Sequence, residues 1–135
     1  MSERRPSPAF PDGEQAVAFH RALMARLGLD ASGAVNEAGL RASLERAQQM
    51  GQGQRADAVS LAAFLLFGLI RDKPFETANT QTALALMLAF LIRNGVAGEA
   101  PDEELAGVSI GVAQGEVYAG MVEMWLRDSA RPIYR

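Results

Sequence analysis

The residues best suited to chemistry lie in a short polar stretch that precedes a long apolar run. They are Lys73, Glu76, Thr77, Asn79, Thr80 and Gln81. Pro74 disfavours helix in the residues before it, whereas residues 82–92 are apolar on nearly all sides and predict a buried helix. Thr77 and Asn79 are good N-cap types, and Gly95 suits the left-handed position after the helix. The free N–H groups at such a helix N-terminus predict an anion site formed by the six polar residues.

The order of these residues resembles the core motif of the Fic/Doc (Fido) superfamily, most closely that of the small Doc (death-on-curing) toxins. The family pattern runs His-x-Phe-x-Asp/Glu-Ala/Gly-Asn-Lys/Arg-Arg, then Thr-Ala and an apolar helix that ends in Asn-Gly. This chain keeps Phe75, Ala78 and Asn79, and its apolar run closes at Asn94-Gly95. The resemblance covers most of the chain and implies an all-α fold of about six helices around a buried central helix, with a short flap.

The resemblance also implies roles that four substitutions remove. In active members of the family the histidine deprotonates a target hydroxyl, the acid holds magnesium, and the two basic residues hold nucleotide phosphates. Here Lys73 replaces the histidine, Thr77 the acid, and Thr80 and Gln81 the basic pair. A lysine ammonium is a poor base near neutral pH, and a neutral hydroxyl is a weaker magnesium ligand than a carboxylate. Two lost charge-assisted hydrogen bonds, each worth ~1.5–3 kcal/mol, would lower nucleotide affinity by several orders of magnitude.

We therefore predict a degenerate Doc/Fic-like protein without normal nucleotide-transferase or kinase activity, which acts by binding a protein or a ligand. On this hypothesis it has no metal site and no cofactor, and ATP and Mg²⁺ would matter only if the motif still functions. Two alternatives stay open. The chain could be an active Doc/Fic-type toxin that transfers phosphate or AMP to a protein hydroxyl through Lys73, Glu76 and Asn79, or it could be a plain helical interaction domain. Doc toxins are paired with small antitoxins that lend a helix to a groove, so the resemblance implies an antitoxin-like or target protein as partner.

Apolar spacing predicts the remaining elements. Helices are expected over residues 15–27, 36–50, 58–71, 105–113 and 117–126, with a strand as the alternative for residues 108–112. Residues 1–13, which are polar and rich in proline, predict a flexible N-terminal arm, and residues 14–135 predict a single helical domain. Residues 51–55, rich in glycine and glutamine, predict a loop that is either a peptide-docking flap or a solvated connector. His20, the only histidine, is expected to pack between helices with one hydrogen bond rather than act as a base or a ligand.

Length and composition exclude several classes of protein. A chain of 135 residues, 49% of them hydrophobic, forms one ordinary globular domain. A net charge of −3 gives no basic surface for nucleic acid, and the absence of cysteine excludes disulfides and cysteine-based metal sites. The apolar runs are too short to cross a bilayer, which takes ~20 residues, and the N-terminus lacks the apolar core of a secretory signal. We expect a cytoplasmic protein, and the sequence leaves its oligomeric state open.

Overall fold

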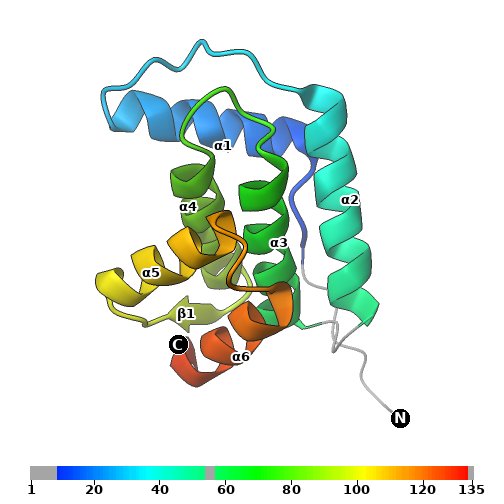
Figure 1. The fold of residues 1–135 in the computed structure, drawn as a ribbon, viewed down its shortest axis with the longest axis vertical. Coiled ribbons are helices and arrows are strands. Elements are labelled where there is room, and N and C mark those ends of the chain that lie inside the picture. The colour runs from blue at the N-terminus through cyan, green and yellow to red at the C-terminus, as the bar shows by residue number, and fades with distance from the viewer. Residues whose placement is uncertain (1–8, 54–56, 134–135) are drawn as a thin grey trace.

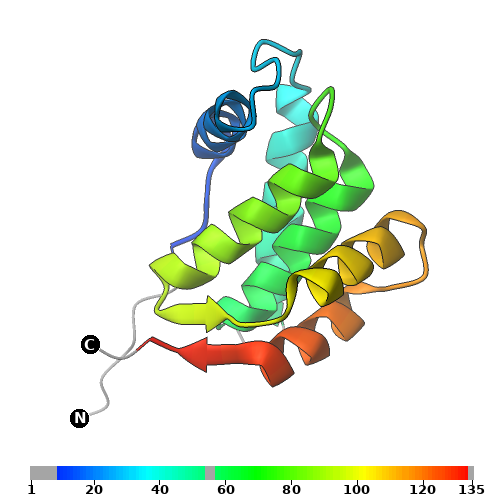
Figure 2. The same ribbon diagram turned by 90° about the vertical axis from the view of Figure 1, so that its left-hand side faces the viewer.

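The computed structural model describes residues 9–53 and 57–133, which form six helices and two short strands. The elements are α1 (Gly13–Arg26), α2 (Glu37–Gly53), α3 (Ala58–Asp72), α4 (Asn79–Arg93), β1 (Val96–Gly98), α5 (Asp102–Ala113), α6 (Ala119–Ser129) and β2 (Ala130–Pro132). Figure 1 shows α3 and α4 in the middle of the molecule, with α1 across one end and α2 along one side. Helices α5 and α6 lie together on the side of α3 and α4 that faces away from α1, as Figure 2 shows. The predicted all-α fold is confirmed.

The helix that is buried on almost all sides is α3. It packs against α2, α4, α5 and α6, and it is buried from Ser60 to Leu66 without interruption. Helix α4 was predicted to be buried on all sides, but one of its faces is only partly covered, and Ile92 at its end is 60% exposed. The difference arises because α2 and α6 both pack mainly on α3 and leave one face of α4 partly open.

Local signals set most helix ends. Asp12 and Gln15 form a capping box at the start of α1, and Gly28 follows its end in a left-handed conformation with φ +71°. Gly95 takes the same conformation after α4, with φ +79°. Helix α5 begins after Pro101 with three acidic residues in its first turn, which favours the helix because acidic side chains stabilise the positive end of its dipole.

The predicted loop over residues 51–55 is wrong in its first part, because α2 continues to Gly53. Gly51 is buried against α3, and a Cβ atom at this position would lie only 2.7 Å from the Cδ2 atom of Leu61. The glycine therefore allows two helices to approach closely rather than breaking one of them. Residues 54 and 55 lie outside the described residues.

Two short strands were not predicted. Strand β1 follows α4 and pairs antiparallel with β2 at the end of the described chain, with Ala97 opposite Arg131. Strands of three residues are too short to give a periodic pattern. The strand considered for residues 108–112 is wrong, because these residues belong to α5.

The residues before α1 lie against the core. The ring of Phe10 packs edge-on against Phe90 of α4, with 5.5 Å between ring centroids. Most of the predicted arm, residues 1–8, lies outside the described residues. Across the described ranges, none of the helices combines the length and the apolar character needed to span a membrane.

Candidate functional site

The polar motif forms the loop between α3 and α4, residues 73–78, which we call the motif loop. Lys73 ends α3 in the left-handed conformation with φ 48°, and Ala78 begins α4 in the same conformation with φ 60°. Neither residue is glycine, so each carries backbone strain of the order of 1 kcal/mol. The two left-handed residues reverse the chain within six positions and bring α4 back along α3.

Phe75 anchors the motif loop in the core. Its side chain is 4% exposed and stacks on the imidazole of His20 in α1, with ring centroids 4.0 Å apart. The Nδ1 atom of His20 lies 2.7 Å from the hydroxyl oxygen of Thr82 in the first turns of α4. Burial, and after it the positive charge of Arg21, lower the pKa of His20 below its ordinary value. The histidine therefore packs between elements with one hydrogen bond, as predicted.

Asn79, the first residue of α4, is hydrogen-bonded to Phe75 of the motif loop. Its Oδ1 atom accepts a hydrogen bond from the N–H of Phe75, and its Nδ2 donates to the carbonyl of the same residue, both at 2.9 Å. The prediction that Thr77 or Asn79 caps α4 is wrong, because Ala78 is the N-cap and makes no side-chain cap bond. The side-chain amide of Asn79 bonds to Phe75 in the preceding loop and not to a backbone N–H of α4. The first turn of α4 is thus left without a side-chain cap.

The connection between α1 and α2, residues 27–36, lies against the motif loop. Val35 and Phe75 form an antiparallel bridge, and the N–H of Asn36 donates to the carbonyl of Pro74 at 2.8 Å. The Glu76 carboxylate accepts a hydrogen bond from the N–H of Ala34 at 2.9 Å. These contacts make one short ladder between segments that are forty residues apart in the sequence.

Arg21 of α1 holds this connection from the other side. Its guanidinium donates to the carbonyls of Ala31 and Gly33. The sequence predicted a loop at residues 51–55, either a peptide-docking flap or a solvated connector, but residues 51–53 are the last residues of α2 and lie at the end of the molecule opposite the motif loop (Figure 1). The segment beside the motif is therefore residues 27–36, and its run of glycine, alanine, serine and aspartate was the available signal.

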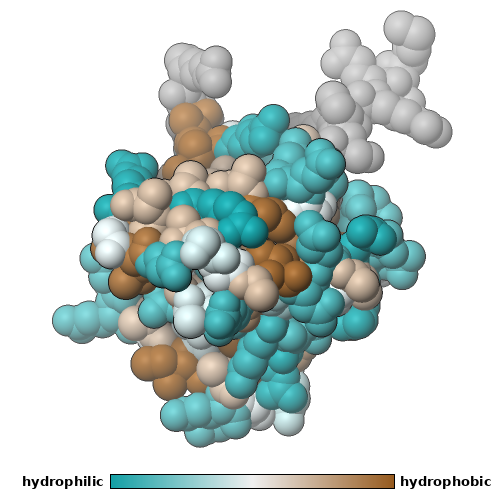
Figure 3. Space-filling view, turned by 90° about the horizontal axis from the view of Figure 1, so that it is seen from above, coloured by the Kyte–Doolittle hydropathy of each residue, from teal (hydrophilic) through white to brown (hydrophobic). Residues whose placement is uncertain are grey.

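The six predicted residues lie in the motif loop and the first turn of α4. Lys73, Glu76, Thr77 and Gln81 are exposed, and Asn79 and Thr80 are half-buried. Figure 3 shows this end of the molecule, on which hydrophilic side chains lie between small apolar patches. Glu76 and Asn79 already bond to backbone groups. Of the six residues, Lys73 and Thr77 of the motif loop and Thr80 and Gln81 of α4 therefore remain for other contacts, one ammonium and three neutral side chains.

This donor set does not fit a magnesium–nucleotide complex. Magnesium is held in proteins by one or two carboxylates together with phosphate oxygens and water. The one carboxylate of the motif loop, Glu76, is turned to the N–H of Ala34, and Thr77 supplies only a neutral hydroxyl. Within residues 9–53 and 57–133, no group of three or more His, Cys, Asp or Glu side chains is placed to hold a metal ion. Thr80 and Gln81 provide no positive charge for a phosphate chain.

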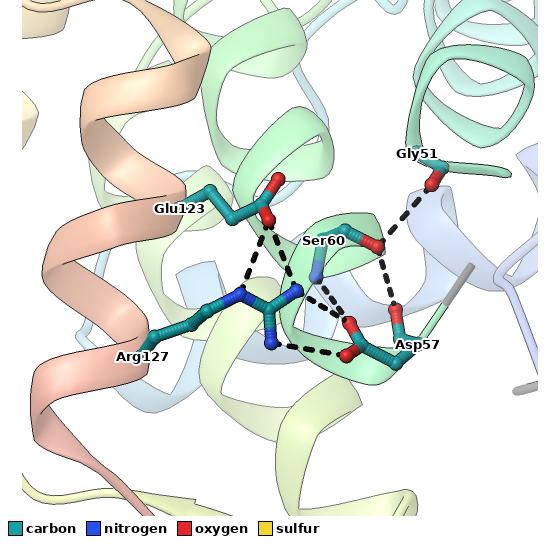
Figure 4. A network of polar contacts seen from close by, with 5 residues as sticks. All are labelled: Gly51, Asp57, Ser60, Glu123 and Arg127. Carbon is teal, nitrogen blue, oxygen red and sulfur yellow. Dashed lines mark hydrogen bonds and ion pairs between the residues drawn. The ribbon is translucent and has the colours of Figure 1, made fainter. Parts of the chain in front are cut away.

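A separate polar network fixes the far end of the fold. Arg127 of α6 forms a two-pronged ion pair with Asp57, the N-cap of α3, and a second ion pair with Glu123 (Figure 4). Partial burial raises the pKa of Asp57, but hydrogen bonds from Arg127 and Ser60 outweigh it, so the pKa lies below its ordinary value. This network holds α6 on α3 and lies away from the motif loop. The network could not be read from the sequence, because Asp57 and Arg127 are 70 residues apart.

Comparison with protein families decides the relationship. The model of the Fic/DOC family matches residues 10–91, which include α1, the connection, the motif loop and most of α4. The chain belongs to the Fic/DOC family. Among curated proteins, none matches this sequence. The family match covers both segments of the ladder described above, residues 34–36 and 74–76.

Proposed function

We propose that this Fic/DOC protein has lost nucleotide transfer and acts by binding another protein through the retained fold. The observation that carries the proposal is the use of the motif's polar side chains. Asn79 and Glu76, the residues that could still touch a nucleotide, are bonded to the backbone of Phe75 and Ala34. Their present task is to shape the loop.

The substituted positions support the same conclusion. Lys73 stands where the family's base is expected, and an ammonium has no lone pair with which to accept a proton. Thr77, Thr80 and Gln81 cannot replace the charges of an acid and two basic residues. Nucleotide affinity in such a site depends on charge-assisted bonds, which are roughly twice as strong as neutral ones.

One observation supports a second candidate function, that of an active Doc/Fic-type toxin. The first turn of α4 has no side-chain cap, so its backbone N–H groups remain available to an anion. A Doc/Fic-type toxin with rerouted residues, which transfers phosphate or AMP to a protein hydroxyl, would use Lys73 beside this helix end. For either candidate function we propose an antitoxin-like or target protein as partner and a cytoplasmic location in a bacterium.

Calorimetric titration with ATP, with and without magnesium, separates the two candidates. We expect no binding heat at millimolar nucleotide for the native chain, and no transfer of label from radioactive ATP to protein. The matched variant restores the four family identities: Lys73→His, Thr77→Asp, Thr80→Lys and Gln81→Arg. These four positions are exposed or half-buried, so the fold should tolerate the changes.

The restored variant should gain magnesium-dependent nucleotide binding, because the loop and the uncapped helix end are already in place. Binding of ATP by the native chain that Lys73→Ala weakens tenfold or more would contradict the proposal and favour the rerouted enzyme. Failure of the restored variant alone would show that the loop shape, and not only the side chains, has changed.

A further inference from the structure

The outer face of α6 exposes large apolar side chains. Helix α6 packs on α3 and buries Val122 and Leu126. On its outer side Met121 is 52% exposed and Met124 is 72% exposed, and Tyr118, the N-cap of the helix, is 60% exposed. At 3.6 residues per turn, positions 118, 121 and 124 fall within about 120° of the helix circumference and form one face. Figure 2 shows α6 at the edge of the molecule, beside α5.

A hydrogen bond from Trp125 places a carboxylate of α5 beside this face. Trp125 is half-buried and follows Met124, and its indole N–H donates to the carboxylate of Glu104 at 3.1 Å. Asp128 lies one helical turn after Met124 and is exposed. We call this surface the α5–α6 patch, and it consists of Glu104, Tyr118, Met121, Met124, Trp125 and Asp128.

The region around the patch is strongly acidic. Residues 96–130 contain seven acidic residues and one basic residue, a net charge of −6, whereas the whole chain carries −3. The basic residue, Arg127, is already paired with two carboxylates. Among the described contacts, no ion pair uses either carboxylate of the patch. The negative charge of this region is therefore available to a partner.

One cation lies at the end of the patch. Arg131 follows α6 in β2, and its guanidinium donates to two backbone carbonyls at the end of the helix. Glu99 is exposed and lies at the same end, because its N–H donates to the carbonyl of Ser129. Together with Glu104 and Asp128 it gives three exposed acids against one base, so the local charge is negative.

These properties select one class of partner. Clustered exposed apolar side chains mark interaction surfaces, and methionine adapts its flexible side chain to a partner. Nucleic acids and anionic lipid surfaces are negatively charged and are repelled by an acidic region. A second copy of this chain would bring the same net charge of −6 to the contact. The complementary surface is a basic protein segment that also carries apolar side chains.

We propose that the α5–α6 patch docks a segment of a partner protein that is rich in lysine or arginine and carries apolar side chains. The inference rests on the proposed function, protein binding, and names the surface and the chemistry of the partner. The patch lies outside residues 10–91, which the family model matches, so the family pattern does not supply it.

The test uses the emission of Trp125, the only tryptophan of the chain, as a reporter on the patch. Three short peptides of equal length and without aromatic residues are compared: leucine with lysine, serine with lysine, and leucine with glutamate. At low salt the leucine–lysine peptide should shift the emission of the full chain to shorter wavelength, because it removes water from the indole. It should bind at least ~10-fold tighter than the other two peptides.

Three results would overturn the proposal. Equal binding of the serine–lysine peptide would show attraction to charge alone, and equal binding of the leucine–glutamate peptide would show apolar contact alone. No binding of the leucine–lysine peptide, or binding by anisotropy of a labelled peptide without a shift of Trp125 emission, would exclude the patch.

A first pair of variants removes the apolar part of the patch. Met121→Gln with Met124→Gln should weaken binding of the leucine–lysine peptide ~10-fold, and the fold should tolerate both changes because both side chains are exposed. The matched control is Leu27→Gln with Leu29→Gln, two side chains that are 54% and 53% exposed outside the patch. An equal loss in the control would refute the site.

A second pair removes the charge. Glu104→Gln with Asp128→Asn keeps an oxygen that can accept the bond from the Trp125 indole, yet it should weaken binding ~5-fold at low salt and less at high salt. The control is Glu14→Gln with Glu45→Gln, two exposed acids on α1 and α2, for which affinity should stay within about twofold. Equal effects of the two pairs would mean non-specific attraction to an acidic protein and would contradict the proposal.

Other occupants give distinct results. A large gain in peptide affinity after removal of residues 1–8 would show that the chain's own N-terminal segment occupies the patch. Self-association that Met121→Gln with Met124→Gln abolishes would indicate a second copy, and a shift of Trp125 emission by phosphatidylserine vesicles would indicate a membrane. Each of these results replaces the proposal. The nucleotide titration is independent: ATP transfer by a protein that binds the leucine–lysine peptide would refute the proposed function and leave the patch assignment intact.

Discussion

Replacement of Asn79 by alanine tests whether the motif is now a structural device. The change removes two hydrogen bonds of 2.9 Å, each worth ~1 kcal/mol net, between the Asn79 amide and the backbone of Phe75. Alanine forms helix better than asparagine, which returns up to ~0.5 kcal/mol. We therefore expect a loss of ~1.5–2 kcal/mol in the free energy of unfolding, or a fall in Tm of ~5–10 °C.

Urea unfolding followed by circular dichroism measures this loss. Thr80→Ala is the matched control, since Thr80 is the next residue of α4, is also half-buried, and has no side-chain hydrogen bond among the described contacts. Its midpoint should change by less than a third of the Asn79→Ala shift.

A third variant separates two roles of the same residue. Serine is among the best N-cap residues but cannot bridge both backbone groups of Phe75. If Asn79 acts as the structure indicates, Asn79→Ser should be about as unstable as Asn79→Ala. Recovery of native stability by serine, or an alanine loss no larger than that of Thr80→Ala, would refute the reasoning.

Three further predictions concern stability. Because the pKa of His20 is lowered from 6.5 in the folded protein, the unfolded chain binds more protons than the folded one below that pH. The contribution of His20 to stability should therefore be full above pH 6.5 and be lost as the pH falls through the folded pKa. The slope of urea midpoints between pH 7.5 and pH 5.5 should be flatter in His20→Gln than in the native protein. Gly51→Ala should cost ~1–3 kcal/mol in urea unfolding because its Cβ would meet Leu61, whereas Gly53→Ala, with nothing within 4 Å, should be neutral or stabilising; equal effects would contradict the close approach of α2 and α3. Arg127→Gln should lower the unfolding free energy by ~1–2 kcal/mol, since Asp57 and the less exposed Glu123 lose their partner while solvent screens part of the effect, and no change in Tm would show that the network contributes nothing.

The helices were largely predictable because their signals are local. Apolar spacing, the glycines at positions 28 and 95, and proline at position 101 act within a turn or two of the chain, and each marks an element end that the structure confirms. Local signals are misleading where a residue is required by a neighbour that is distant in the sequence. Gly51 was predicted to lie in a loop, but it belongs to α2, where the absence of a side chain lets Leu61 of α3 approach closely.

The candidate site divides in the same way. The motif residues and their departure from the family pattern are properties of the sequence, and the family match supports the relationship over residues 10–91. Which segment lies against the motif could not be read from spacing. Residues 51–55 were predicted to form a loop, with a peptide-docking flap as one interpretation, because they are rich in glycine, but residues 27–36 contact the motif loop instead.

By itself, the sequence determined the helical class, the ends of most helices and the residue types of the motif, because each depends on residue type and near neighbours. Only the tertiary structure decided that Asn79 bridges Phe75, that Glu76 bonds to Ala34, and that Trp125 of α6 bonds to Glu104 of α5. These features depend on which groups the fold brings within hydrogen-bond distance. A carboxylate or an amide has several possible partners, and the packing of distant elements selects one of them.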